Sequence, residues 1–209
     1  MWNVCVSFFE LLPFQLHCCW SHGCDGVITI AIHIDKNVFL SLSLSLLLLS
    51  VKQIESFMSE IGTSMKVVVI KAIRQLCLRY PRKSGLLLQF MHNCLRDEGE
   101  FAYKQALVNT ILDLMDKLEG MKTAGLNALG EFIEDCEFPQ LSKQVLHVLG
   151  TEAPSTGTPG RYIRYIFNRV ILEVPSVRAA AVSALAKLAA RVASVSFFSV
   201  SFHILFSHC

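Results

Sequence analysis

The most suggestive chemistry in this sequence lies in a run of basic and aromatic residues over 161–169. Three arginines and three aromatic residues alternate there: Arg161, Tyr162, Arg164, Tyr165, Phe167 and Arg169. Residues three apart share a helical face, so Arg161 and Arg164 point the same way. Such a surface suits an acidic protein partner or a membrane surface. We therefore take Arg161, Arg164 and Arg169 as candidate partner contacts. The alternative is a solvated basic face whose aromatic residues pack inside.

Patterns typical of catalysis or metal binding are missing from the sequence. Glu131, Glu134 and Asp135 have the spacing of one helical face, but no histidine stands at the Glu-x-x-His spacing of a carboxylate metal site. Segment 150–160 is rich in Gly, Pro and Thr and lacks the Gly-Lys-Ser/Thr of a phosphate-binding loop. No Gly-x-Ser-x-Gly is present. The sequence predicts no catalytic residue, no metal site and no cofactor, and hence a protein that is not an enzyme.

The eight cysteines do not form a zinc-binding pattern, because no Cys-x-x-Cys pair occurs among them. Four of them lie in the first 24 residues. Cys77, Cys94 and Cys136 fall one per helical segment at apolar positions, where cysteine behaves as a small hydrophobic residue. Without a secretion signal, these thiols favour a reducing, cytosolic compartment.

Charge divides the chain into three parts. The sequence is 53% hydrophobic and 17% charged, whereas a soluble domain carries about 25% charged residues. Residues 52–191 nevertheless hold 32 of the 36 charged residues, and residues 192–209 hold none. We therefore predict a hydrophobic, low-complexity piece over 1–50, a domain of soluble composition over 51–191 and an uncharged hydrophobic tail over 192–209. The mild basic excess of the middle part is too small to indicate nucleic-acid binding.

The two ends raise one alternative, a small membrane-anchored helical protein. Residues 37–51 form an apolar run of about 15 residues, and a helix needs about 20 to cross a bilayer. The Ser-Leu alternation at 41–49 suits a strand better than a helix, but no partner strand is evident nearby. We expect both ends to be poorly structured or not native to the fold.

The middle part has helical periodicity throughout. Apolar stripes at helical spacing predict seven helices, over 64–80, 85–96, 100–117, 121–135, 140–149, 162–173 and 176–191. Gly or Pro residues mark the short connections between them, and segment 150–160 reads as a flexible linker. No segment of 52–191 has a strand pattern, so we predict an all-α fold.

Three of these helices share one template, in 66–76, 104–114 and 178–188. Each opens with a basic residue, has a β-branched residue at +4, a small or short residue at +6, and leucine at +10. The +4 residues are Ile70, Val108 and Val182, and the +6 residues are Ala72, Thr110 and Ala184. A weaker copy begins at Lys143 and is cut short by Gly150. The copies start 38, 39 and 35 residues apart, near the period of HEAT and armadillo helix pairs, so we predict an α-solenoid.

Four blocks of the middle part resemble the HEAT-like trunks of the adaptin/coatomer family. They are VVVIKAIRQLCLRYPR at 67–82, FIEDCEF at 132–138, YIRYIFNRVILE at 162–173 and VRAAAVSALAKL at 177–188. FIEDCEF followed by YIRYIFNRVILE is typical of the coatomer gamma branch. The resemblance covers residues 51–190, and the two ends lie outside it.

The resemblance implies a structural subunit fragment of the COPI vesicle coat, acting as a protein-binding scaffold in transport between Golgi and endoplasmic reticulum. It implies assembly with other coatomer subunits, recruitment by an Arf-family GTPase and recognition of cargo cytoplasmic tails. It also implies a cytoplasmic location, peripheral on the Golgi membrane and on COPI-coated vesicles.

Overall fold

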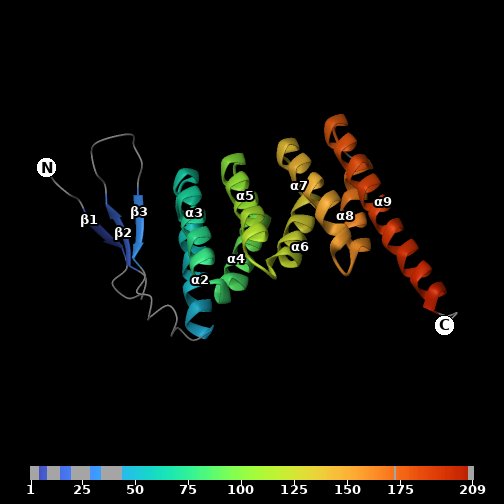
Figure 1. Ribbon diagram of the computed structural model, residues 1–209. Coiled ribbons are helices and arrows are strands. Elements are labelled where there is room, and N and C mark those ends of the chain that lie inside the picture. The colour runs from blue at the N-terminus through green and yellow to red at the C-terminus, as the bar shows by residue number, and fades with distance from the viewer. Residues whose placement is uncertain (1–4, 9–14, 20–28, 34–43, 172, 207–209) are drawn as a thin grey trace. The chain divides into compact units, whose positions relative to one another are not determined.

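The computed structural model describes residues 5–8, 15–19, 29–33, 44–171 and 173–206 (Figure 1), with side chains over 51–171 and 173–192. The chain divides into two compact units, Met1–Phe90 and Met91–Cys209. We describe each unit by itself.

The first unit combines three short strands with two long helices. Strands β1 (Cys5–Phe8), β2 (Gln15–Cys19) and β3 (Thr29–His33) form an antiparallel sheet in that order, with Cys5 opposite Cys19 and Gln15 opposite His33. Helix α2 (Leu44–Glu60) and helix α3 (Thr63–Arg79) follow. A 3₁₀ turn, η1 (Pro81–Lys83), leads into helix α4 (Ser84–Arg96), whose second half belongs to the other unit.

The second unit is a double layer of helices. It contains α5 (Phe101–Lys117), α6 (Met121–Glu134), α7 (Pro139–Glu152), the 3₁₀ turn η2 (Ala153–Ser155), α8 (Pro159–Ile171) and α9 (Pro175–Phe206). Helices α5, α7 and α9 follow one another in one layer, and α6 packs on α8 in the other (Figure 1). Gly120 makes the turn between α5 and α6 with a φ of 83°, a left-handed conformation that favours glycine.

The prediction of an all-α solenoid is confirmed for the middle part. All seven predicted helices are present, and the four template copies fall in α3, α5, α7 and α9. Two boundaries in the region of segment 150–160 were wrong. Helix α7 continues to Glu152 and α8 begins at Pro159, so η2 and three further residues replace most of the predicted linker.

Most of the template's apolar positions lie in the core of these helices, whereas Leu76, the +10 residue of α3, is half-buried. Ile70 and Val108, at +4, have no exposed surface, and Leu114 and Leu188, at +10, are also fully buried. Val182, the +4 residue of α9, is instead 53% exposed. The face of α9 that carries Val182 is therefore uncovered among the described residues.

The small +6 residue of α9 permits a close approach between α9 and α7. Ala184 of α9 lies against Gly150 of α7, and a Cβ placed on Gly150 would come within 2.8 Å of the Ala184 Cα. The prediction that Gly150 ends its helix was wrong. The glycine is buried inside α7, because only a residue without a side chain lets the two backbones pack this closely.

Much of the two ends, for which we expected poor structure, lies outside the described residues. In the part that is described, two features differ from the sequence pattern. The strand pattern of the Ser-Leu repeat was misleading, because α2 begins at Leu44 and includes most of it. Leucine is a strong helix former, and the repeat continues directly into the helical periodicity after residue 51. Three strands occur before it that the sequence analysis did not predict.

Helices cross both predicted domain boundaries. Helix α2 spans 50/51 and α9 continues past 191 to Phe206. The division into 1–50, 51–191 and 192–209 remains a prediction. Within the described part of the chain, no helix has both the length and the apolar character needed to cross a bilayer.

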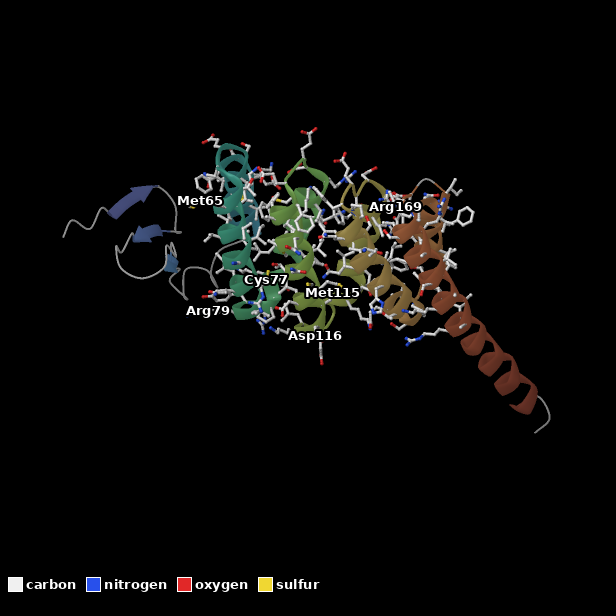
Figure 2. All side chains as sticks on the ribbon, turned by 90° about the horizontal axis from the view of Figure 1, so that it is seen from above. Met65, Cys77, Arg79, Met115, Asp116 and Arg169 are labelled. Carbon is white, nitrogen blue, oxygen red and sulfur yellow. The ribbon has the colours of Figure 1, made fainter. Side chains whose placement is uncertain are left out.

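The three cysteines of the described helical region are buried, as predicted, and none of them forms a disulfide. Cys77, Cys94 and Cys136 are each at most 4% exposed, and Cys77 lies on α3 (Figure 2). Burial raises the pKa of the Cys77 thiol to about 12. The adjacent backbone hydrogen bond only partly offsets this effect.

Replacing Gly150 with alanine tests the α7–α9 contact. We expect Gly150→Ala to lower the free energy of unfolding by about 1–2 kcal/mol, because overpacking against a fixed backbone outweighs the helix propensity gained. Gly160→Ala is the matched control, since a Cβ at Gly160 in α8 meets nothing within 4 Å. That change should be neutral or stabilising by up to about 1 kcal/mol. Urea unfolding of the full chain measures both, and equal effects would contradict the close approach.

The raised pKa of Cys77 predicts slow alkylation. Only the thiolate reacts, and at pH 9 about one folded molecule in a thousand would carry it. We expect iodoacetamide at pH 9 to modify Cys77 more than 100-fold more slowly in the folded protein than in urea, as followed by peptide mass spectrometry. The folded state keeps this proton where the unfolded state loses it, so stability should fall as pH rises above about 9. Equal rates in both states would contradict the burial of Cys77.

Candidate interaction surface

Arg161 joins α8 to α6. Its Nη2 donates to Glu131 Oε1 at 3.0 Å, and its Nε donates to the Tyr165 hydroxyl at 3.0 Å within α8. The hydrogen bond to Tyr165 is the main cause of the raised pKa of Arg161. The side chain stays 47% exposed, so the ion pair with Glu131 lies at the surface and contributes little to stability.

Arg169 is part of the packing between α8 and the end of α6. Its guanidinium donates to the carbonyl oxygens of Glu134, at 3.1 Å, and of Cys136, and it forms an ion pair with Glu173. The side chain is 12% exposed and lies among the helices of the second unit (Figure 2). Arg169 therefore satisfies carbonyl groups that the C-terminus of α6 leaves without helical partners.

Arg164 differs from its two neighbours. It is exposed on α8, and within the described residues it has no hydrogen bond or ion pair. The aromatic residues around it also differ in burial. Tyr162 and Tyr165 are buried, whereas Phe167 is 53% exposed. Of the three predicted contact residues, Arg164 is thus the one whose charge is available to a partner.

The predicted acidic triplet takes part in contacts between helices. Glu131 on α6 accepts from Arg161 through one oxygen and lies 2.9 Å from His92 Nε2 through the other. Glu134 accepts from Asn168 of α8 at 3.3 Å. These contacts link α4, α6 and α8. Among the described residues, no group of His, Cys, Asp or Glu side chains has the arrangement of a metal site.

Lys104 has the same structural role at α4 that Arg169 has at α6. It is 5% exposed, and its ammonium donates to the carbonyl oxygens of Leu95 at 2.7 Å, Cys94 at 3.2 Å and Asp97. These carbonyls end α4, where a cation also interacts favourably with the helix dipole. The template predicted a basic residue at this position without indicating that it is buried.

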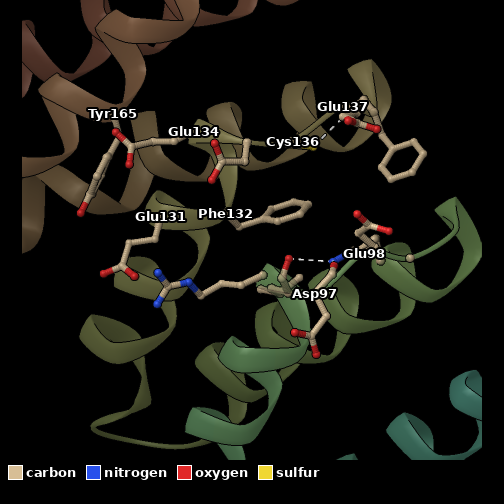
Figure 3. A pocket seen from close by; sticks show the side chains of 14 residues that line it. Asp97, Glu98, Glu131, Phe132, Glu134, Cys136, Glu137 and Tyr165 are labelled. Atoms are coloured by element: carbon tan, nitrogen blue, oxygen red, sulfur yellow. Dashed lines mark hydrogen bonds between the residues drawn. The ribbon is translucent and has the colours of Figure 1, made fainter. Parts of the chain in front are cut away.

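A pocket of about 530 Å³ lies where the α4–α5 turn faces the end of α6 (Figure 3). Its walls carry six carboxylates, from Asp97, Glu98, Glu131, Glu134, Asp135 and Glu137. Phe132, Phe138 and Tyr165 supply aromatic surface. Lys104 lies at its edge with its ammonium already bonded to carbonyl groups. Arg96 also lines the pocket, so six carboxylates face two basic side chains. The pocket is therefore acidic overall, and it suits a cationic group.

Sequence reasoning did not identify this pocket. Its carboxylates come from the α4–α5 turn and, more than thirty residues later, from the end of α6 and the turn that follows it. Only the stacking of helix pairs brings them together. The internal repeat was the sequence feature that pointed toward such a pocket, because equivalent turns of consecutive helix pairs lie next to one another in a solenoid.

Comparison with known proteins finds a family that matches the helical part of the chain. The family model described as the adaptin N terminal region matches residues 49–197. The matched region contains every residue of the interaction surface described above.

Curated relatives are similar over the same part of the chain. Coatomer subunit gamma-1 of Oryza sativa subsp. japonica is 55% identical over 141 residues, which is 68% of this chain and 16% of that protein. Coatomer subunit gamma-2 of Danio rerio is 54% identical and coatomer subunit gamma-1 of Homo sapiens 53% identical, each over 140 residues and 16% of its length. The chain thus spans about one sixth of the length of these relatives.

Replacing Arg169 and Arg164 with methionine, one at a time, should distinguish their roles. We expect Arg169→Met to lower the free energy of unfolding by about 3 kcal/mol, because it leaves Glu173 and two carbonyl groups without their partner. Arg164→Met should change it by less than about 0.5 kcal/mol. Urea unfolding curves of both variants, followed by circular dichroism, provide the measurement. A loss of stability at Arg164 as large as at Arg169 would contradict the assignment.

Proposed function

The chain belongs to the adaptin N-terminal region family, and from that membership we propose that it is a structural subunit fragment of the COPI vesicle coat. Its role is that of a protein-binding scaffold in transport between Golgi and endoplasmic reticulum, without enzymatic activity. The observation that carries the proposal is the similarity to coatomer gamma subunits, 53–55% identical over two thirds of the chain.

The fold supports a scaffold function. Stacked helix pairs present extended surfaces, and proteins of this architecture bind other proteins through them. The second unit offers two surfaces of opposite charge within one stack of helices. One is the acidic pocket, and the other is the exposed side of α8 around Arg164.

The partners follow from the same proposal. Other coatomer subunits are the primary partners. An Arf-family GTPase recruits the coat, and the coat binds cargo cytoplasmic tails. The charge of the acidic pocket is suited to a basic tail. The proposed location is the cytoplasm, with peripheral association on the Golgi membrane and on COPI-coated vesicles.

Within this proposal, Arg164 is the side chain that meets an acidic surface on a partner, and Arg161 supports it. Arg161 is still half exposed although it bonds Glu131, so its charge contributes to the same surface. Arg169 acts indirectly, because it holds the end of α6 against α8.

The test is co-precipitation of coatomer subunits with the tagged full chain from cells. We expect recovery of at least one other coatomer subunit, and a reduction of at least fivefold for Arg164→Glu. The reason is that charge reversal places like charges opposite one another at the contact.

Lys143→Glu serves as the control, because Lys143 is an exposed basic residue in α7, which lies in the other layer. It should leave recovery unchanged. Failure of the unmodified chain to recover any coatomer subunit would reject the proposed function. Unchanged recovery with Arg164→Glu would reject the contact at Arg164 alone.

A further inference from the structure

Positive charge is concentrated in one short stretch of the first unit. Residues 61–90 contain six cations and no carboxylate, whereas residues 97–191 contain ten cations and twelve carboxylates. All six cations belong to α3 and η1. A surface that only keeps a protein in solution mixes both signs of charge, and a single sign along a whole helix is typical of a surface that attracts an opposite charge.

Burial divides these cations into two groups of three. The half-buried group, whose members already interact with other residues, is Lys66, Arg74 and Lys83. The exposed group, which we name the α3 basic patch, is Lys71, Arg79 and Arg82. Among the described residues, the side chains of Lys71 and Arg82 form no hydrogen bond or ion pair. Their charges are therefore available to a partner.

Arg79 is held in place without losing its hydrogen-bond donors. Its guanidinium carbon lies 5.9 Å from the centre of the Tyr80 ring, and Tyr80 is buried at the end of α3 (Figure 2). A contact with a ring face uses none of the five N–H donors of a guanidinium. Binding through Arg79 therefore costs little side-chain entropy. Arg79 and Arg82 can each bind a carboxylate through two parallel hydrogen bonds.

The α3 basic patch has the length of a short extended peptide. Lys71 and Arg79 are eight residues apart on α3, which is about 12 Å along the helix axis. About four or five residues of extended chain cover this distance and reach the turn at Arg82. Gln75 is exposed halfway between Lys71 and Arg79, and its amide can both donate to and accept from a peptide backbone.

Two other anionic partners fit the α3 basic patch less well. An anionic membrane attracts each surface cation by about 1 kcal/mol, so three cations bind it weakly unless apolar side chains insert beside them. The large apolar side chains that are exposed among the described residues all lie in the second unit. Electrostatic binding to nucleic acid relies on more phosphate contacts than three cations provide.

We propose that the α3 basic patch binds an extended acidic segment of a partner protein. Carboxylates of that segment pair with Arg79 and Arg82, and a further one pairs with Lys71. Gln75 bonds the backbone of the segment between them. This contact is additional to the one at Arg164, which belongs to the second unit.

Fluorescence anisotropy of a labelled peptide of eight glutamates, titrated with the full chain, tests the proposal. We expect saturable binding that Arg82→Glu weakens at least about tenfold and Lys71→Gln at least about threefold. Arg178→Glu is the matched control, because Arg178 is an exposed cation of α9 and its reversal changes the net charge by the same amount as Arg82→Glu. It should change the affinity less than about twofold. Circular dichroism verifies that each variant is folded.

Three results would overturn the proposal. The first is the absence of saturable binding of the glutamate peptide at chain concentrations up to about 200 µM. The second is an equal loss of affinity in Arg82→Glu and Arg178→Glu, because it reveals an effect of net charge without a site. The third is binding to phosphatidylserine vesicles or to single-stranded RNA that Arg82→Glu abolishes and the glutamate peptide does not compete with. That outcome assigns the α3 basic patch to a membrane or to a nucleic acid.

Discussion

Each helix pair of this protein relies on its neighbour to bury apolar surface that the pair alone would leave in water. In the second unit, Leu107, Leu129, Leu149 and Leu188 are fully buried although they belong to four different helices. Each such side chain contributes about 2 kcal/mol when it leaves water, so the core depends on the helices lying at contact distance. Gly150 and Ala184 make that distance possible between α7 and α9. The rest of the architecture, including the position of every functional side chain, follows from this stacking.

Stacking alone would allow the layers to slide, and two buried cations oppose this. Lys104 bonds the carbonyl groups that end α4, and Arg169 bonds those that end α6. In each case a side chain from a later helix satisfies the unpaired C-terminal carbonyls of an earlier one. Because these bonds are directional and the carbonyl groups are fixed, they specify a register that apolar contacts by themselves do not. The acidic pocket lies between these two anchored helix ends.

The sequence predicted the helices well because their signals are local. Apolar stripes and the Gly or Pro residues between them defined α3 to α9 to within a few residues, apart from the ends around 150–160 and the continuation of α9. Gly150 was misread because a glycine that ends a helix and a glycine that admits another backbone look alike in sequence. The Ser-Leu repeat was misread for a related reason, since a period of two does not prevent helix formation by leucines attached to a strong helix. The burial of Lys104 and the acidic pocket could not be predicted, because both arise only when helix pairs pack.

The three arginines of α8 show what this limit means for function. They are equivalent by residue type, yet Arg169 is buried in the packing between helices, Arg161 is half exposed and Arg164 is exposed. A charge already bonded to a neighbouring helix end must break those bonds before it can meet a partner, and the partner then has to compensate for them. Natural selection can therefore tune partner contacts most freely at positions that the stacking leaves unused. On α8 these include Arg164 and the exposed apolar side chains of Ile163 and Phe167. A surface of this kind can evolve new contacts without changing the helix packing that displays it.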